Sequence, residues 1–280
     1  MNHLLRGHAP ISDGGWKLID DEAAERLRPA LAARRVVDFS GPHGWQHSAT
    51  NLGRTTALAA DLVDGVGGRQ RRVLPLVELR ADFTIALREL ADHDRGALDP
   101  DLDDLDRAAY QIAMAENVAV AHGWREAAIR GIAEASPHKG PPLAATIDAY
   151  PRPVAAAVEL LLAQGISGPY GLLLGREEYT RVIESAEHGG YPLLEHLGKI
   201  LDGPIVWAPG VSGGLVLSLR GGDFLFESGQ DFAVGYDHHD VDAVYLYLQE
   251  SFSFVVATPE AAVALAAHGK PAPRPRRQTR

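Results

Sequence analysis

The segment from Ala243 to Val256 constrains the fold of this chain more than any other part of the sequence. Its side chains alternate between two sets, and only Glu250 interrupts the apolar set. Such alternation places one set on each face of a β-strand, and the segment is longer than the usual strand of about 5–6 residues. A glycine-rich turn, Gly221-Gly222-Asp223-Phe224, lies shortly before it. We therefore predict one long strand that completes a sheet begun much earlier in the chain.

Length, charge and cysteine content exclude several classes of protein. The 280 residues are 46% hydrophobic, which is enough for one large domain or two smaller ones. The formal net charge is −10, although the charged side chains of the last thirteen residues are all basic. So acidic a body argues against a nucleic-acid groove, which needs clustered cations. The chain has no cysteine, which excludes disulfides, thiolate metal sites and cysteine nucleophiles.

No targeting or membrane segment is apparent in the sequence. The N-terminus lacks an apolar core of signal-peptide length. The most apolar helical run, residues 154–163, is short and contains Glu159. We therefore expect a soluble cytoplasmic protein that has no membrane partner.

Residues 1–41 are predicted to form an N-terminal arm followed by an amphipathic helix. Ser12 is a suitable N-cap for this helix. Apolar residues recur at helical spacing from Trp16 to Leu31, and Pro29 should kink or shorten the helix. Because the opposite face is highly charged, the helix is expected to lie on a surface with its apolar stripe against another element.

Residues 42–75 have an unusual composition for part of a compact domain. Small polar residues alternate with short β-prone pieces, and a glycine-rich tip at 65–68 is followed by three arginines. A long stretch with little core of its own is usually functional, disordered or paired with a neighbour. We predict a two-stranded arm that reaches another chain, where its backbone groups would find partners.

Helices and short strands alternate in the middle of the chain, whereas strands dominate on both sides of it. The patterns predict helices at 102–122, 154–164, 176–185 and 193–201, and strands at 170–174, 205–208 and 215–219. The last two strands are predicted to form a hairpin. This arrangement indicates the α+β class, and the Pro/Arg-rich tail at 266–280 is expected to be disordered.

Three short motifs are candidates for chemistry, and each has a simpler explanation. Ser212 lies in a G-x-S-x-G sequence, but a nucleophile elbow needs a helix after the serine, whereas a strand pattern follows here. His238 and His239 are candidate metal ligands, but adjacent strand residues point to opposite faces, which favours a polar turn. The aspartate-rich run at 92–106 lacks the glycine and glutamate that an EF-hand requires.

The connection between the helices at 176–185 and 193–201 is acidic and glycine-rich and contains a histidine. An ordinary helix connection would account for it. In a symmetric ring, however, one such loop from each subunit would line a pore, and its charge would govern the passage of ions. The candidate pore residues are Glu184, Glu187, His188, Gly189, Gly190 and Tyr191.

Short segments spread in order over residues 3–265 match one known family. They include Arg34-Arg35-Val36-Val37-Asp38, Gly41-Pro42-His43-Gly44-Trp45, Leu74-Pro75-Leu76-Val77-Glu78-Leu79-Arg80, Arg220-Gly221-Gly222-Asp223-Phe224 and Leu246-Tyr247-Leu248-Gln249-Glu250. With these segments the chain resembles the encapsulins, bacterial nanocompartment shell proteins also described as linocin or bacteriocin-type. The resemblance implies the tailed-phage major capsid fold of the Hong Kong 97 type. Its expected parts are a lumenal helix within 1–41, an extended loop at 42–75, a peripheral domain at 76–135 and 225–265, and an axial domain at 136–224 that carries the five-fold pore loop.

In this family the N-terminal helix and the adjoining sheet bind a short C-terminal peptide of a cargo enzyme. Such a peptide should insert apolar side chains into a groove. The candidate peptide-binding residues are Leu27, Leu31, Arg34, Asp38, Phe232, Val234 and Tyr236. The alternative is that these residues only fix the helix to the sheet. Some encapsulins bind a flavin through a tryptophan at a position where this chain has Arg88, so no cofactor is expected here.

The resemblance thus implies a non-enzymatic shell protein that assembles into an icosahedral compartment around an oxidoreductase. By family habit the cargo is a dye-decolourising peroxidase or a ferritin-like protein. The expected partners are copies of the chain itself and the cargo, with no nucleic acid and no membrane. A prophage major capsid protein, a secreted bacteriocin or protease, and a stand-alone metal enzyme stay open as alternatives.

Overall fold

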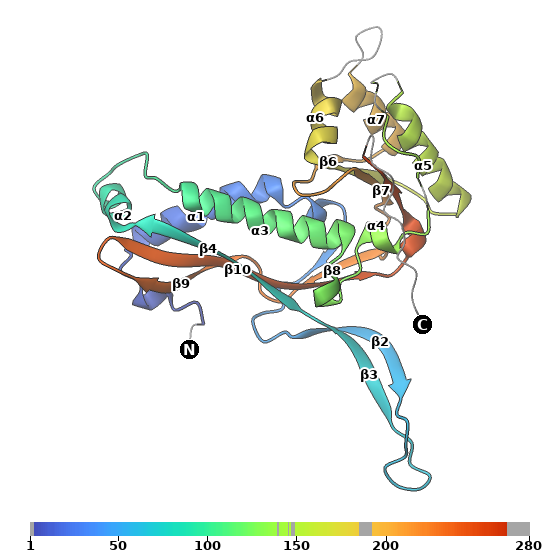
Figure 1. The fold of residues 1–280 in the computed structure, drawn as a ribbon, viewed down its shortest axis with the longest axis horizontal. Helices are drawn as coiled ribbons and strands as arrows, with labels where there is room; N and C mark the ends of the chain where they lie inside the picture. The colour runs from blue at the N-terminus through green and yellow to red at the C-terminus, as the bar shows by residue number, and fades with distance from the viewer. Residues whose placement is uncertain (1–2, 139, 145, 147–148, 185–191, 268–280) are drawn as a thin grey trace.

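The computed structural model describes residues 3–138, 140–144, 146, 149–184 and 192–267. It contains two β-sheets, each accompanied by helices, and a two-stranded hairpin that projects away from both (Figure 1). The larger sheet lies with its helices on one side of the molecule, and the smaller sheet forms a second lobe. This arrangement agrees with the predicted α+β class.

Strand β10 (Ala243–Val256) is the central strand of the larger, five-stranded sheet, and its bounds are those predicted. It pairs with β4 (Val77–Ala86) in the antiparallel sense over ten positions. Along its other edge it pairs with β9 (Ala233–His239) and then with β8 (Phe224–Ser228). Strand β1 (Asp38–Ser40) adds to β8 in the parallel sense. Because β1 and β4 come far earlier in the chain, the prediction that the long strand completes an earlier sheet is confirmed.

Helices α1 (Asp13–Ala30) and α3 (Asp103–His122) cover one face of the larger sheet (Figure 1). The Ser12 hydroxyl accepts a hydrogen bond from the Gly15 amide at 2.9 Å, which confirms the predicted N-cap. Pro29 lies in the last turn of α1, and the helix ends one residue later, as expected for a shortened helix. Helix α2 (Leu87–Asp94), between β4 and α3, was not predicted. Short 3-10 helices are η1 (Arg6–His8), η2 (Ala33–Arg35), η3 (Arg125–Ala127) and η4 (Pro259–Ala261).

The smaller sheet has the strand order β11-β7-β5-β6. Its strands are β5 (Tyr170–Leu174), β6 (Ile205–Trp207), β7 (Gly214–Ser218) and β11 (Ala262–Leu265). The predicted hairpin between β6 and β7 is wrong, because β5 lies between them, parallel to β6 and antiparallel to β7. The sequence prediction placed β11 in the peripheral segment 225–265, but its pairing with β7 assigns it to the smaller sheet.

Helices α5 (Pro151–Ala163), α6 (Arg176–Glu184) and α7 (Leu193–Leu201) pack around the smaller sheet. Helices α6 and α7 lie where they were predicted, whereas α5 begins earlier than expected because proline is tolerated in the first turn of a helix. The short helix α4 (Ile132–Ala135) packs between α3 and β11 and so links the two lobes. No helix in the described ranges is long and apolar enough to cross a membrane.

Strands β2 (Ala49–Ala57) and β3 (Arg69–Pro75) form the projecting hairpin. Their antiparallel pairing confirms the predicted two-stranded arm. Most side chains of both strands are exposed, so the hairpin has almost no core of its own.

Candidate functional site

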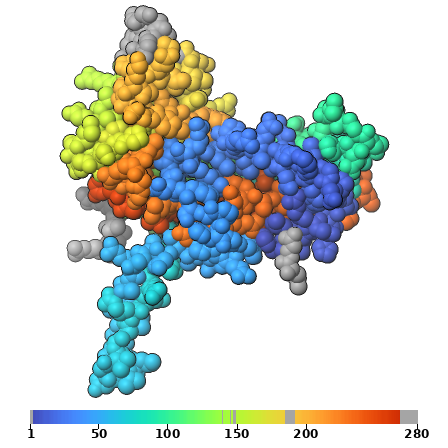
Figure 2. Space-filling view, turned by 180° about the vertical axis from the view of Figure 1, so that it is seen from behind, coloured from blue at the N-terminus to red at the C-terminus, as the bar shows by residue number. Residues whose placement is uncertain are grey.

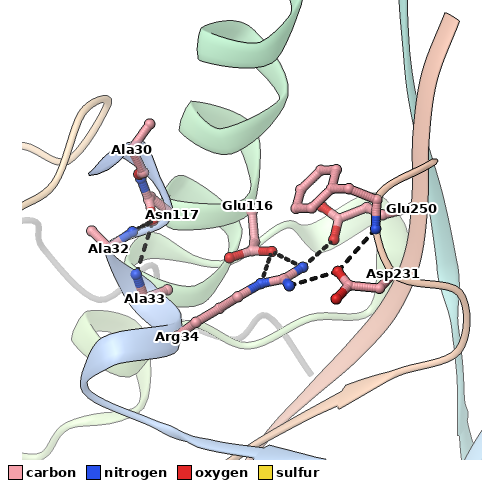
Figure 3. A network of polar contacts seen from close by, with 9 residues as sticks. Ala30, Ala32, Ala33, Arg34, Glu116, Asn117, Asp231 and Glu250 are labelled. Carbon is pink, nitrogen blue, oxygen red and sulfur yellow. Dashed lines mark hydrogen bonds and ion pairs between the residues drawn. The ribbon is translucent and has the colours of Figure 1, made fainter. Parts of the chain in front are cut away.

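Arg34 is the centre of a buried ionic network that joins four parts of the chain (Figure 3). It lies on η2, shortly after the end of α1. Its guanidinium donates from Nε to Glu116 on α3 at 2.8 Å and from Nη2 to Glu250 on β10 at 2.8 Å. A third bond of 2.7 Å runs from Nη1 to Asp231, between β8 and β9. One cation therefore ties the N-terminal segment to α3 and to two parts of the larger sheet.

The next residue of α3, Asn117, fixes the backbone just before this arginine. Its side-chain oxygen accepts hydrogen bonds from the amides of Ala32 and Ala33, each at 3.0 Å. Its amide nitrogen donates to the carbonyl of Ala30 at 2.8 Å. These backbone groups lie at the C-terminus of α1, where helical partners run out. One turn of α3 thus holds both the backbone and the charged side chain of the segment after α1.

The network carries more negative than positive charge. Burial raises the pKa of Glu116, and burial together with the neighbouring Glu116 raises the pKa of Glu250 well above its usual range. Burial by itself would lower the pKa of Arg34, but the two glutamates outweigh it and raise that pKa, so the guanidinium stays charged. Loss of Arg34 would leave two buried carboxyl groups without their counter-ion.

Three phenylalanine rings surround the Arg34 guanidinium. Its Cζ atom lies 4.9 Å from the ring centroid of Phe39, 5.2 Å from that of Phe226 and 4.8 Å from that of Phe232. The faces of aromatic rings attract a guanidinium at such distances. Phe226 is buried, whereas Phe39 is 38% exposed and Phe232 is half-buried. The outer rings therefore offer apolar surface to a ligand beside a fixed positive charge.

The structure divides the seven predicted peptide-binding residues between core and surface. Leu27, Val234 and Tyr236 are 5%, 2% and 9% exposed and belong to the core between α1 and the sheet. Their burial favours the alternative interpretation, namely that they fix the helix to the sheet. Leu31 and Phe232 are half-buried and pack against the same core, so part of each side chain faces outward.

Asp38 does not share the environment of Arg34. Its carboxylate accepts a hydrogen bond from the Gly222 amide at 2.7 Å and lines a cavity of about 160 Å³ beside the glycine-rich turn before β8. Successive residues of a strand point to opposite faces, so Phe39 rather than Asp38 meets the guanidinium. Phe39 was not predicted as a site residue, and the alternation within β1 was the available signal.

The segments that carry these residues meet on the face shown in Figure 2. Orange residues of the β8–β9 region lie there between the dark blue N-terminal segment and the lighter blue residues that follow α1. Segments far apart in the sequence therefore contribute to one surface. The partly exposed Phe39 and Phe232 come from two of these segments and both lie against Arg34.

The predicted pore loop lies almost wholly outside the described residues. Glu184 is the last residue of α6, and its side chain is exposed. The positions of the other candidates are not described; these are Glu187, His188, Gly189, Gly190 and Tyr191. The assignment of this loop to a pore stays a prediction.

The other motifs considered for chemistry, around Ser212 and His238, lie in surroundings that explain them structurally. The backbone amide of Ser212 donates to Nε2 of His122 at 3.1 Å, and β7 follows directly, so a strand stands where a nucleophile elbow needs a helix. His238 stacks on Tyr245 at the end of β9, with ring centroids 4.2 Å apart. Within the described ranges, no group of three or more His, Cys, Asp or Glu side chains could hold a metal ion.

Arg88 lies on α2, and its side chain is 81% exposed and contacts Glu89 at 3.1 Å. The arginine side chain is charged and has no aromatic ring on which a flavin could stack. The expectation that no flavin binds at this position stays a prediction.

A protein-family model described as "encapsulating protein for peroxidase" matches residues 1–253. The chain belongs to the encapsulin family. A type 1 encapsulin shell protein of Rhodospirillum rubrum is 46% identical over 270 residues, which cover 95% of this encapsulin and 96% of that protein. A type 1 encapsulin shell protein of Rhodococcus erythropolis is 41% identical over 268 residues, 95% of this chain and 100% of the relative. The implied family membership is confirmed, and membership in a family of shell proteins makes the role structural rather than enzymatic.

Solved structures share the fold of this encapsulin. The virus-like particle of Pyrococcus furiosus aligns with a TM-score of 0.60 at 16% identity, over 89% of this chain and 98% of that chain. The capsid of an empty GTA particle aligns with a TM-score of 0.55 at 16% identity, over 86% and 91% of the two chains. At such low identity the likeness concerns the fold alone, and it confirms the Hong Kong 97-type capsid fold.

Proposed function

We propose that this encapsulin assembles with copies of itself into a closed icosahedral shell. The observation that carries this proposal is the match, over 95% of the chain, to proteins named as type 1 encapsulin shell proteins. The capsid fold supports it, because proteins with this fold form the particles named above. Relatives at 41% and 46% identity favour a compartment shell over a prophage capsid, since the two particle structures share only 16%.

The projecting hairpin supports an assembly in which subunits embrace one another. At its tip Leu62, Val63 and Val66 are 95%, 63% and 61% exposed. An isolated two-stranded hairpin is only marginally stable, and exposed apolar side chains gain from burial against a partner. We therefore place the β2–β3 hairpin on a neighbouring subunit of the shell.

Electron microscopy of the purified protein tests the shell directly. We expect closed particles of uniform diameter, formed without any other protein. A stable monomer or small oligomer at the same protein concentration would contradict the proposal.

We further propose that the shell encloses a cargo enzyme, whose C-terminal peptide binds beside Arg34. Leu31, Phe39 and Phe232 supply partly exposed apolar surface there, and a peptide could insert apolar side chains between them. The family description, "encapsulating protein for peroxidase", favours a dye-decolourising peroxidase, and a ferritin-like protein is the second candidate. Under this proposal α1 faces the lumen of a cytoplasmic compartment.

The substitution Leu31→Asp tests the peptide surface. The aspartate would not make the apolar contact that Leu31 makes with the peptide, and its carboxylate would be costly to desolvate when the peptide binds. The binding free energy should weaken by at least about 1.4 kcal/mol, which corresponds to a tenfold weaker affinity. We expect shells of normal size that co-purify with at least tenfold less of a co-expressed peroxidase carrying its C-terminal peptide.

The matched control is Leu98→Asp, because Leu98 is 97% exposed in the loop between α2 and α3. This control should load cargo like the unmodified shell. Normal loading of intact Leu31→Asp shells would show that the peptide binds elsewhere, whereas failure of that variant to form shells would point to α1 as a folding element only.

A further inference from the structure

The network around Arg34 has an excess of negative charge that ion pairing does not balance. One guanidinium faces three carboxyl groups, and the side chains of Glu116 and Glu250 are fully buried. Each of these two also has one carboxyl oxygen, Oε1, that is buried without a hydrogen-bond partner. Two ionised carboxylates in this position would repel each other where charges are poorly screened, and their unpartnered oxygens would stay uncompensated.

We propose that Glu116 and Glu250 form a proton-binding site that holds one proton at neutral pH, mainly on Glu250. The bound proton reduces the site to one buried carboxylate, Glu116, beside Arg34. The third acid, Asp231, is 43% exposed at its side chain, so water can stabilise its charge.

The surroundings leave few other charges to balance the pair. Among the described residues, the charged groups that face it are Arg34 from η2 and Asp231 from the β8–β9 turn. The rings of Phe39, Phe226 and Phe232, contributed by β1, β8 and the same turn, surround the guanidinium. A proton is therefore the simplest source of the missing positive charge.

The pKa of Glu250 supports this assignment. Burial is the main reason that it is raised well above the usual range, and Glu116 raises it further, while Arg34 opposes the shift without cancelling it. A glutamate in an unfolded chain has a pKa of about 4.3, so the folded subunit binds the proton more tightly than the unfolded chain. The resulting stabilisation is complete below that value and is lost as the pH rises towards the folded pKa of Glu250.

The site lies where the segment after α1 meets α3 and the sheet, so its charge state affects the contacts between them (Figure 3). Loss of the proton adds a second negative charge to a buried junction that has one cation. The folded subunit should therefore be more stable in mildly acidic than in alkaline solution. The proton site belongs to the subunit itself and does not depend on whether the shell binds the proposed cargo.

Thermal unfolding of the assembled protein from about pH 6 to about pH 9 tests the site. Glu250→Gln keeps the shape of a protonated glutamate but cannot ionise. The matched control is Glu78→Gln, since Glu78 is exposed on the adjacent strand β4. Below the folded pKa, the Tm of the unmodified protein and of the control should fall by about 3 °C per pH unit, whereas Glu250→Gln should lose most of this slope. Equal slopes for both variants would overturn the proposal.

A second measurement does not require the Glu250→Gln variant to fold. The infrared spectrum of protein labelled with ¹³C at its glutamate carboxyl groups distinguishes protonated from ionised side chains. We expect a protonated-carboxyl band in the unmodified protein at neutral pH, where ordinary glutamates are ionised, and its disappearance as the pH is raised. A spectrum with only ionised glutamates at neutral pH would also overturn the proposal.

Discussion

Two neighbouring residues of α3 act on the same junction in different ways. Glu116 compensates the charge of Arg34, whereas Asn117 compensates backbone groups. The Asn117 amide also donates to the carbonyl of Pro209 at 3.3 Å, in the loop that follows β6. This side chain therefore connects the end of α1 with the smaller lobe, and a buried amide with this many partners has no apolar substitute.

The substitution Asn117→Ala should destabilise the subunit more than an ordinary surface change. It leaves the buried amide of Ala33 without its acceptor, whereas the Ala32 amide keeps its bond to the Ala30 carbonyl, and the loss should cost about 1–3 kcal/mol and lower the Tm by a few degrees. The control is Gln111→Ala, which removes an exposed amide from the same helix. We also expect faster amide hydrogen exchange in residues 31–36 of Asn117→Ala. Similar Tm values for the two variants would show that Asn117 contributes little.

At the scale of secondary-structure elements, sequence periodicity was informative where one element carries its own pattern. Strand β10 was predicted because its alternation is long, and α3 because its apolar residues recur at helical spacing. Helix α2 was missed because Leu90 is its only buried residue, which leaves no recognisable stripe. The predicted pairing of β6 with β7 was wrong. Strands that are close in sequence often form a hairpin, but here β5, which comes earlier in the chain, lies between the two strands.

The candidate site was predictable only in part, for a related reason. Arg34 came from a family resemblance, but its buried partners Glu116 and Glu250 are 82 and 216 positions away, and no local pattern connects them. Glu250 was nevertheless visible in the sequence as the one interruption of the apolar face of β10. The structure gives the physical reason for that interruption, since this carboxyl group is a buried partner of the arginine.

At the scale of the whole molecule, the two lobes and the hairpin are built on different principles. Buried side chains form one cluster between α1, α3 and the larger sheet and a second that extends from the smaller sheet to β8 and the end of β10, whereas the strands of the hairpin are mostly exposed. The body of the subunit should therefore fold without the hairpin. Assembly into a shell should require it, because the hairpin extends away from the body (Figure 1). Among the described residues its strands pair only with each other, and its apolar tip is exposed.

A shortened hairpin separates these two requirements. Arg54 and Arg72 are paired across the hairpin, so residues 55–71 can be replaced by Asn-Gly, which favours a tight two-residue turn. We expect the variant to fold, with a cooperative thermal transition and a circular dichroism spectrum typical of an α+β protein. It should elute as a monomer or small oligomer, and electron microscopy should show no shells. Because the spectrum and the transition report on the body alone, misfolding can be distinguished from failed assembly. Shells of normal size from this variant would show that contacts between the two lobes of neighbouring subunits are sufficient to build the particle.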